Sequence, residues 1–153
     1  MDRIRNIINY EARAFFEIAE KEYRTYSVDL TNLKVDDFYK IIPVIVNLAL
    51  SIELYLKGFQ VRARGHDLEA LFFSSPDWLQ KSVVNAYIVS QNQLDNDKKI
   101  SDNDFFRLLK VNAKAFEDWR YFYERGSDVN VGFLYTLAKI LNNLYSTING
   151  MIN

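Results

Sequence analysis

The segment AFEDWRYFYERGSD, residues 115–128, holds the densest group of side chains that can do chemistry. Two guanidinium groups, two phenols and a carboxylate follow one another closely there: Arg120, Tyr121, Tyr123, Glu124 and Arg125. Arginine and tyrosine together suit the recognition of phosphates and bases, and they are also enriched in protein interfaces. These five residues are therefore the candidate binding residues. The same spacing also fits an ordinary amphipathic helix, with aromatic residues toward the core and charged residues toward solvent.

His66 is the only histidine of the chain, so acid–base chemistry at neutral pH has one histidine available to it. It lies in RARGHDLEALF, between the predicted end of one helix and the start of another. We expect Gly65 to end the first helix, and Asp67 to cap the second, with His66 satisfying free backbone groups at the same junction. This structural role is favoured over a catalytic one because capping needs no further partner. Glu53 and Lys57 are expected to form an ordinary surface ion pair.

The acidic segment DNDKKISDND, residues 95–104, has the composition of a calcium loop but not its pattern. An EF-hand loop starting with this segment needs glycine at its sixth position and glutamate at its twelfth, where the chain has Ile100 and Phe106. A capping box formed by Ser101 and Asp104 explains acidic residues here. The chain has no cysteine, and one histidine cannot build a multi-histidine site, so no metal and no cofactor are expected.

The composition places these side chains in a single globular domain, residues 1–153. Apolar residues make up 49% of the 153 residues and aromatic residues 15%, which is enough for a substantial core. The formal net charge is −1, without the basic excess that is usual in proteins that bind nucleic acid non-specifically. The start of the chain has no signal-peptide pattern, and the uncharged run over residues 41–52 is too short to span a bilayer. We therefore expect a soluble, cytoplasmic protein.

Apolar residues recur at steps of three and four along most of the chain, which predicts helices. The first helix covers residues 2–26, and a polar connection follows over residues 27–37. The second helix begins around Asp36 to Pro43, is regular from about Pro43 and runs to about Ala63. It is apolar almost all round, which indicates a central position. Three of its residues form a narrow stripe where another backbone can approach closely: Asn47, Ser51 and Gly58.

Four further helices are predicted from capping residues and apolar spacing. They are a short helix containing LEALFF, a helix over residues 76–92 capped by Ser75, a helix from Ser101 to Gly126, and a helix over residues 130–149. No alternating strand pattern competes with them. The sequence therefore predicts an all-α fold, an antiparallel up-and-down bundle of about four long helices plus short helices.

Two segments resemble the HEPN domain family (higher eukaryotes and prokaryotes nucleotide-binding). LSIELYLKGFQVRARGHDLEALF, residues 50–72, is similar to the family's E-L-x-L-K helix, its turn and the G-H-D-L start of the next helix. AFEDWRYFYE, residues 115–124, is similar to a later helix of some bacterial members. The resemblance implies a helical bundle, often a homodimer, and in many members a ribonuclease of toxin–antitoxin, CRISPR-linked or phage-defence systems. Their active residues are an arginine and a histidine a few residues later; Arg120 stands at the arginine's place, but residues 125–127 contain no histidine.

The resemblance without that histidine predicts a non-catalytic HEPN-like binding module. Its ligand would be a nucleotide, RNA or a partner protein, in a bacterial defence or toxin–antitoxin-type system. Two alternatives remain open: a metal-independent ribonuclease with a degenerate active site around Arg120, and a purely structural or regulatory dimer. For the dimer, Tyr10, Phe16 and Tyr26 of the first helix are candidates for an outer face.

Overall fold

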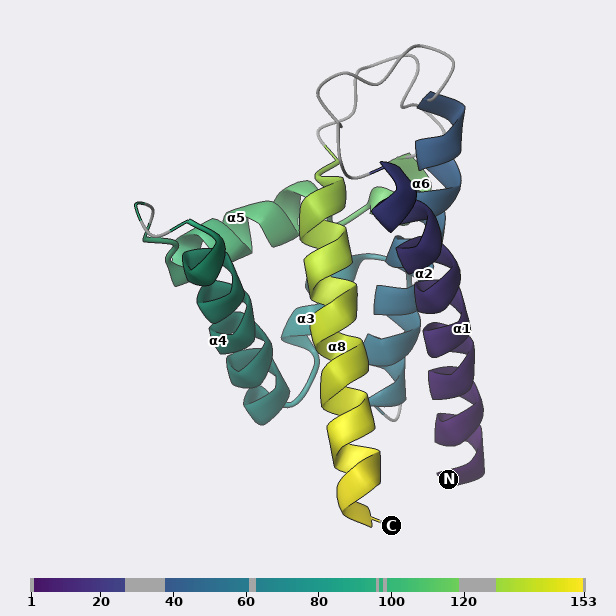
Figure 1. Cartoon of the computed structure of the whole chain (residues 1–153). Coiled ribbons are helices and arrows are strands. Elements are labelled where there is room, and N and C mark those ends of the chain that lie inside the picture. Colours follow the sequence, from purple (N-terminus) through teal and green to yellow (C-terminus); the bar gives the residue numbers. More distant parts are fainter. Residues whose placement is uncertain are drawn as a thin grey trace.

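The computed structural model of the chain describes residues 2–26, 38–60, 63–95, 97, 99–118 and 129–152 (Figure 1). Within those ranges the chain forms seven helices and no strand, so the predicted all-α class is confirmed. The predicted connection over residues 27–37 lies outside the described residues.

Two long antiparallel helices, α1 (Asp2–Tyr26) and α2 (Phe38–Gly58), form one side of the molecule (Figure 1). The bounds of α1 are those predicted. Three buried residues of α1 recur at steps of four and three and line the face that packs on α2: Ala12, Phe16 and Ala19. The two alanines let the helix axes come close.

The outer face of α1 differs from its prediction. Phe16 is 3% exposed and belongs to the core, so its predicted place on the outer face is wrong. Tyr10 is 71% exposed, and the side chain of Tyr26 lies outside the described residues.

α2 begins at Phe38, within the predicted range of residues 36–43, and Pro43 in its second turn removes one backbone hydrogen bond there. α2 differs from its prediction at its end. It ends at Gly58, well before Ala63, because glycine is a poor helix former and α1 lies against this residue. Gly65 lies in the following turn and has a φ of +87°, which favours glycine.

The stripe of small and polar residues on α2 is where α1 approaches. The hydroxyl of Ser51 donates to the backbone oxygen of Ala12 over 2.8 Å. Further along, a Cβ at Gly58 would overlap Oδ1 of Asn9. Close contact between the two backbones therefore depends on the small side chains of this stripe.

By length and composition, α2 is also the one helix among the described residues that is able to cross a membrane. Of its window Tyr39–Gly58, 61% is buried inside the molecule. The core helix of a globular protein meets the same test of length and composition. The cytoplasmic location therefore stays a prediction.

The short helix α3 (Leu68–Phe73) and the longer α4 (Asp77–Leu94) follow in the predicted order. The predicted capping of α4 by Ser75 is wrong. The hydroxyl of Ser75 donates to the backbone oxygen of Phe72, so it closes the end of α3, and Pro76 takes the position before α4.

The predicted helix from Ser101 to Gly126 is two helices in the described residues, α5 (Asp102–Val111) and α6 (Ala115–Asp118). The break lies at Asn112, whose side-chain amide donates to the backbone oxygen of Leu108 over 2.8 Å. Asparagine competes in this way with the helical hydrogen bonds and favours a helix end. Residues 119–126 lie outside the described residues.

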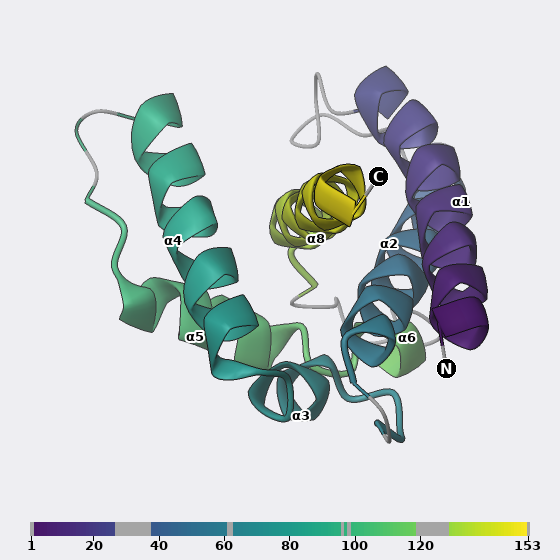
Figure 2. The same ribbon diagram turned by 90° about the horizontal axis from the view of Figure 1, so that it is seen from below.

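The last helix, α8 (Val131–Ile152), lies between the α1–α2 pair and α4 (Figure 2). Along the chain, the long helices α1, α2, α4 and α8 alternate in direction, while α5 runs across them near one end (Figure 1). The predicted apolar face of α8 is confirmed: Phe133, Leu137, Ile140 and Leu141 are buried, and Leu144 packs against them.

The core is one cluster of buried residues to which each of the seven helices contributes at least one residue. On the side of α4 it is aromatic: the rings of Tyr87, Phe105 and Phe133 contact one another, with centroids 5.3–5.7 Å apart. Phe72 of α3 contacts Phe105 at 5.4 Å. These contacts join α3, α4, α5 and α8.

Candidate functional site

A buried carboxylate lies in the middle of the segment that resembles the HEPN family. Glu53 of α2 is 3% exposed, although the sequence predicts a surface ion pair. Nζ of Lys57 lies 2.7 Å from its Oε1, and Nδ1 of His66 lies 2.9 Å from its Oε2. A buried charge needs such donors, because an unpaired carboxylate in a core is strongly destabilising.

The turn after α2 positions His66. Gly65 supplies the left-handed backbone, and the carboxylate of Asp67 accepts a hydrogen bond from the backbone N–H of Ala70, 2.9 Å away, at the start of α3. The N–H of Leu68 donates to the backbone oxygen of Ala113 over 2.8 Å, which ties this turn to the connection between α5 and α6.

The sequence predicts that His66 bonds free backbone groups at this junction. Its imidazole instead bonds the side chain of Glu53 on α2. Its ring also stacks on Phe116 of α6, with centroids 5.5 Å apart and planes 25° apart. Glu53, Lys57, His66 and Phe116 therefore form one group, here called the His66 cluster. The cluster joins α2, the following turn and α6.

The His66 cluster fixes how the imidazole can act. Because Nδ1 faces both oxygens of the carboxylate, it is the nitrogen that carries a proton. The other ring nitrogen, Nε2, points away from Glu53, and the side chain is 53% exposed. Carboxylate–imidazole pairs of this kind hold a ring in one tautomer and one orientation. Among the described residues, the ring has no hydrogen-bond partner besides Glu53, and it joins α2 to α6 through this contact and its stacking on Phe116.

The predicted binding residues Arg120, Tyr121, Tyr123, Glu124 and Arg125 lie outside the described residues. The structure describes the helix before them, α6, which ends at Asp118.

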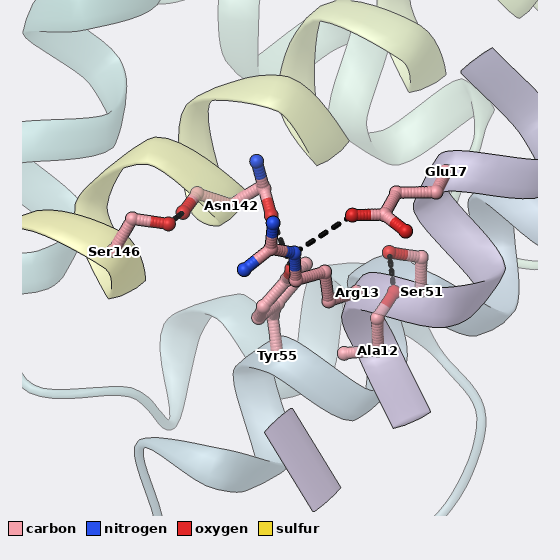
Figure 3. Close-up of polar contacts among 7 residues, drawn as sticks. All are labelled: Ala12, Arg13, Glu17, Ser51, Tyr55, Asn142 and Ser146. Atoms are coloured by element: carbon pink, nitrogen blue, oxygen red, sulfur yellow. Dashed lines mark hydrogen bonds and ion pairs between the residues drawn. The ribbon is translucent and has the colours of Figure 1, made fainter. Parts of the chain in front are cut away.

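A second polar group joins the three long helices α1, α2 and α8 (Figure 3). The hydroxyl of Tyr55 donates to Oδ1 of Asn142 over 2.7 Å, and Ser146 donates to the backbone oxygen of the same residue. Burial raises the pKa of Tyr55 well above its usual range, while the charge of Arg13 acts in the opposite direction. Arg13 itself pairs with Glu17 at 2.8 Å on the exposed side of α1. Of these contacts, the bond from Tyr55 to Asn142 joins α2 to α8, while the other two lie within α8 and α1.

Among the described residues, no group of three or more metal-binding side chains comes together. In the acidic segment, the carboxylate of Asp104 accepts hydrogen bonds from the backbone N–H and the hydroxyl of Ser101, each over 2.9 Å. The backbone bond is the stronger cause of the lowered pKa of Asp104. Asp104 thus stabilises the first turn of α5, as the sequence predicts.

Sequence reasoning missed the contact between Glu53 and His66, which are thirteen positions apart. A signal for it was present, because Glu53 is the first charged residue after the apolar run over residues 41–52 in a helix that is apolar almost all round. A carboxylate on such a helix indicates a buried partner.

The fold and this cluster define an all-α protein with a buried carboxylate–histidine joint. Comparison of the chain with family models, with curated proteins and with solved structures finds no match.

Proposed function

We propose that the protein is a non-catalytic HEPN-like binding module that binds RNA or a nucleotide through Arg120, Tyr121, Tyr123, Glu124 and Arg125. The observation that carries the proposal is the His66 cluster. The E-L-x-L-K part of the resembling segment supplies Glu53 and Lys57, its G-H-D-L part supplies His66, and the two parts meet within 2.9 Å. This contact supports the resemblance, because the residues that define it act together in one structural joint.

The absence of a histidine after Arg120 supports a non-catalytic role. The one histidine of the chain, His66, is held by Glu53 at Nδ1 and by Phe116 at its ring, and it precedes Arg120 in the sequence where the family's motif has the histidine after the arginine. Without a second histidine, an arginine–histidine pair at Arg120 would have to use this ring. A ribonuclease with a degenerate site around Arg120 remains the alternative, and a partner protein is the alternative ligand. The bacterial defence or toxin–antitoxin-type setting is part of the proposal.

The first experiment measures binding and cleavage of a mixed pool of single-stranded RNA by wild type and by Arg120→Ala and Arg125→Ala variants. We expect binding without cleavage, weakened about tenfold by each substitution because one charge-assisted hydrogen bond is lost. Binding should also weaken as salt concentration rises. Lys81→Ala, which removes an exposed cation of α4, is the matched control and should bind as wild type does.

Two results would change the proposal. Cleavage that persists in EDTA and is lost in Arg120→Ala would establish the degenerate ribonuclease instead. Wild-type protein that binds neither the RNA pool nor nucleotides would retire the nucleic-acid ligand and leave a partner protein or a purely structural role. His66→Gln is informative in both cases. If the role of His66 is structural, this substitution should lower the free energy of unfolding more than it weakens RNA binding.

A further inference from the structure

Nε2 of His66 is a nucleophilic atom that the proposed RNA-binding group does not use. Nδ1 of the same ring lies 2.9 Å from Oε2 and 3.0 Å from Oε1 of Glu53, so its N–H donates a hydrogen bond to the carboxylate. A neutral imidazole carries its proton on one nitrogen and a lone pair on the other. The lone pair is therefore on Nε2, and the side chain is 53% exposed.

The His66 cluster holds this imidazole in one orientation. A carboxylate that accepts from one ring N–H fixes the tautomer and raises the basicity of the other nitrogen. Glu53 is buried and also contacts Nζ of Lys57 at 2.7 Å, while Phe116 stacks on the ring of His66 with centroids 5.5 Å apart. The ring is thus fixed from two elements while Nε2 stays open. Histidine is one of the side chains that form covalent intermediates.

The turn that carries His66 is accessible to a large partner. Arg64, Gly65 and His66 are all exposed, and a Cβ at Gly65 would meet no other atom within 4 Å. Arg64 forms no ion pair with any described residue, so its guanidinium is available to an anion that is brought to the turn. Guanidinium groups suit phosphate in particular.

His66 itself is the group that can react here. In the described part of the chain its ring contacts a carboxylate and an aromatic ring, and no hydroxyl group that it could activate as a base. An activated imidazole without such a neighbour is suited to accept a transferred group on its own nitrogen. An acceptor of this kind needs no pocket, because the enzyme that holds the donor supplies the groups that bind the phosphate.

We propose that Nε2 of His66 accepts a phosphoryl group, so that the protein carries a phosphohistidine. The donor is a phosphorylated side chain of a partner protein or a nucleoside triphosphate, and both offer the same phosphoryl group. The modification adds negative charge to an exposed turn, where Arg64 lies two residues away.

The transfer is a single displacement at phosphorus. The lone pair of Nε2 attacks the phosphorus atom, a P–N bond forms, and the bond from phosphorus to the leaving group breaks, with the leaving group taking its electron pair. The proton on Nδ1 stays where it is. The positive charge that develops on the ring is offset by the carboxylate of Glu53, which already faces that proton.

The geometry also determines which nitrogen is modified. A phosphoryl group on Nε2 keeps the hydrogen bond from Nδ1 to Glu53 and the stacking on Phe116, whereas a group on Nδ1 would break the contact with Glu53. We therefore expect the folded protein to carry phosphate on Nε2 alone. In the chain unfolded in urea, both nitrogens are free and both isomers should form.

Three donors test the proposal on the purified wild-type protein: phosphoramidate, which stands for a phosphorylated histidine, acetyl phosphate, which stands for a phosphorylated aspartate, and ATP. Intact mass spectrometry measures uptake of one phosphoryl group, and ³¹P NMR distinguishes the two isomers. Because His66 is the only histidine, a phosphate that is labile in acid and stable in alkali marks this residue, and His66→Gln should take up none. Reaction with any one donor identifies the class of donor.

The role of Glu53 is that of a positioning residue, and Glu53→Gln tests it. This variant should react about tenfold more slowly than wild type under conditions in which circular dichroism shows equal helix content. The matched control is Glu17→Gln, which removes an exposed carboxylate of α1 and should react as wild type does. A purely structural Glu53 would change stability and leave the rate in the folded variant unaltered.

Three results would overturn the proposal: no uptake from any of the donors, phosphate on Nδ1 of the folded protein, or equal rates for wild type and folded Glu53→Gln. The comparison of isomers in folded and urea-unfolded wild type needs no variant, so it holds even if Glu53→Gln fails to fold. The site uses no residue of the proposed RNA-binding group, so phosphorylation of His66 and RNA binding can fail independently of each other.

Discussion

Glu53 holds the junction between α2 and α6 through a single side chain. A carboxylate at 3% exposure depends on its donors, and Lys57 and His66 provide them at 2.7 and 2.9 Å. Because His66 also stacks on Phe116, a change at Glu53 affects contacts on two elements. A substitution of Glu53 is therefore expected to weaken contacts on two elements.

We predict that Glu53→Gln lowers the free energy of unfolding by roughly 1.5–3 kcal/mol, the usual range for hydrogen bonds to a charged group. Glutamine keeps the shape of the side chain but loses the charge that attracts Lys57. Urea unfolding followed by circular dichroism measures the change.

The matched control is Glu17→Gln, which removes an exposed carboxylate that also pairs with a cation four residues away, Arg13 at 2.8 Å. Exposed pairs contribute little, so this variant should stay within about 0.5 kcal/mol of wild type. Equal effects of the two substitutions would show that burial of Glu53 adds nothing to the junction.

The effect of a side chain at position 58 is predicted to depend on Asn9, because a Cβ at Gly58 would overlap Oδ1 of Asn9. Asn9 is 4% exposed, and its Oδ1 has no hydrogen-bond partner among the described residues. Gly58→Ala should destabilise the protein by about 1–3 kcal/mol through overpacking. In an Asn9→Ala background the same change should cost much less, since the space is then free and alanine is the better helix former. A double-mutant cycle measures the coupling, and additive effects would contradict a direct contact.

At the scale of the elements, Asn112 determines where α5 ends and α8 begins. Its side chain donates to the backbone oxygen of Leu108, and its Oδ1 accepts from the N–H of Asn130, both over 2.8 Å. Asn130 in turn accepts a hydrogen bond from the N–H of Phe133 in the first turn of α8. One buried amide thus fixes the end of one helix next to the start of another.

We predict that Asn112→Ala lowers the free energy of unfolding by about 1–3 kcal/mol, because the partly buried N–H of Asn130 loses its acceptor and the backbone oxygen of Leu108 keeps only the backbone N–H of residue 112. Asn143→Ala, an exposed position on α8, should change it by less than about 0.5 kcal/mol. Chemical denaturation of both variants measures the difference. Loss of stability only in Asn143→Ala would contradict the role given to Asn112.

Most helices could be predicted from the sequence because apolar spacing is a local property. Their ends were harder, since they depend on distant residues. Gly58 meets α1 and Asn112 bonds across to Asn130, and neither partner is visible in the local pattern. Ser75 had two local choices, and it bonds backward to Phe72 instead of capping α4.

In the candidate site, too, the contacts between residues distant in the sequence could not be predicted. The spacing of Glu53 and Lys57 predicted their contact, but only the turn at Gly65 brings His66 to the same carboxylate. Periodicity carries no information about such a turn. The predicted binding residues around Arg120 lie outside the described residues and remain a prediction.

At the scale of the whole molecule, tyrosines lie where the long helices meet. The ring of Tyr23 on α1 stacks on Tyr135 of α8 with centroids 4.2 Å apart, and Tyr55 of α2 bonds Asn142 of α8. Burial is the main cause that raises the pKa of Tyr23, Tyr55 and Tyr135, and it does the same for Tyr87 in the aromatic part of the core. Folding thus favours the neutral form of the tyrosine side chains at the contacts between the long helices.

This distribution predicts that the protein becomes less stable in alkaline solution. In the unfolded chain a phenol loses its proton near pH 10, while the buried tyrosines keep theirs to higher pH. The unfolded state then binds fewer protons than the folded state, so the free energy of unfolding falls as pH rises above about 10, and the contribution is fully present below it. Urea unfolding at a series of pH values measures the slope, and tyrosinate absorbance shows which phenols ionise only on unfolding. Tyr55→Phe should give a shallower alkaline slope, because it removes one of these groups, and an unchanged slope would mean that Tyr55 ionises freely in the folded protein.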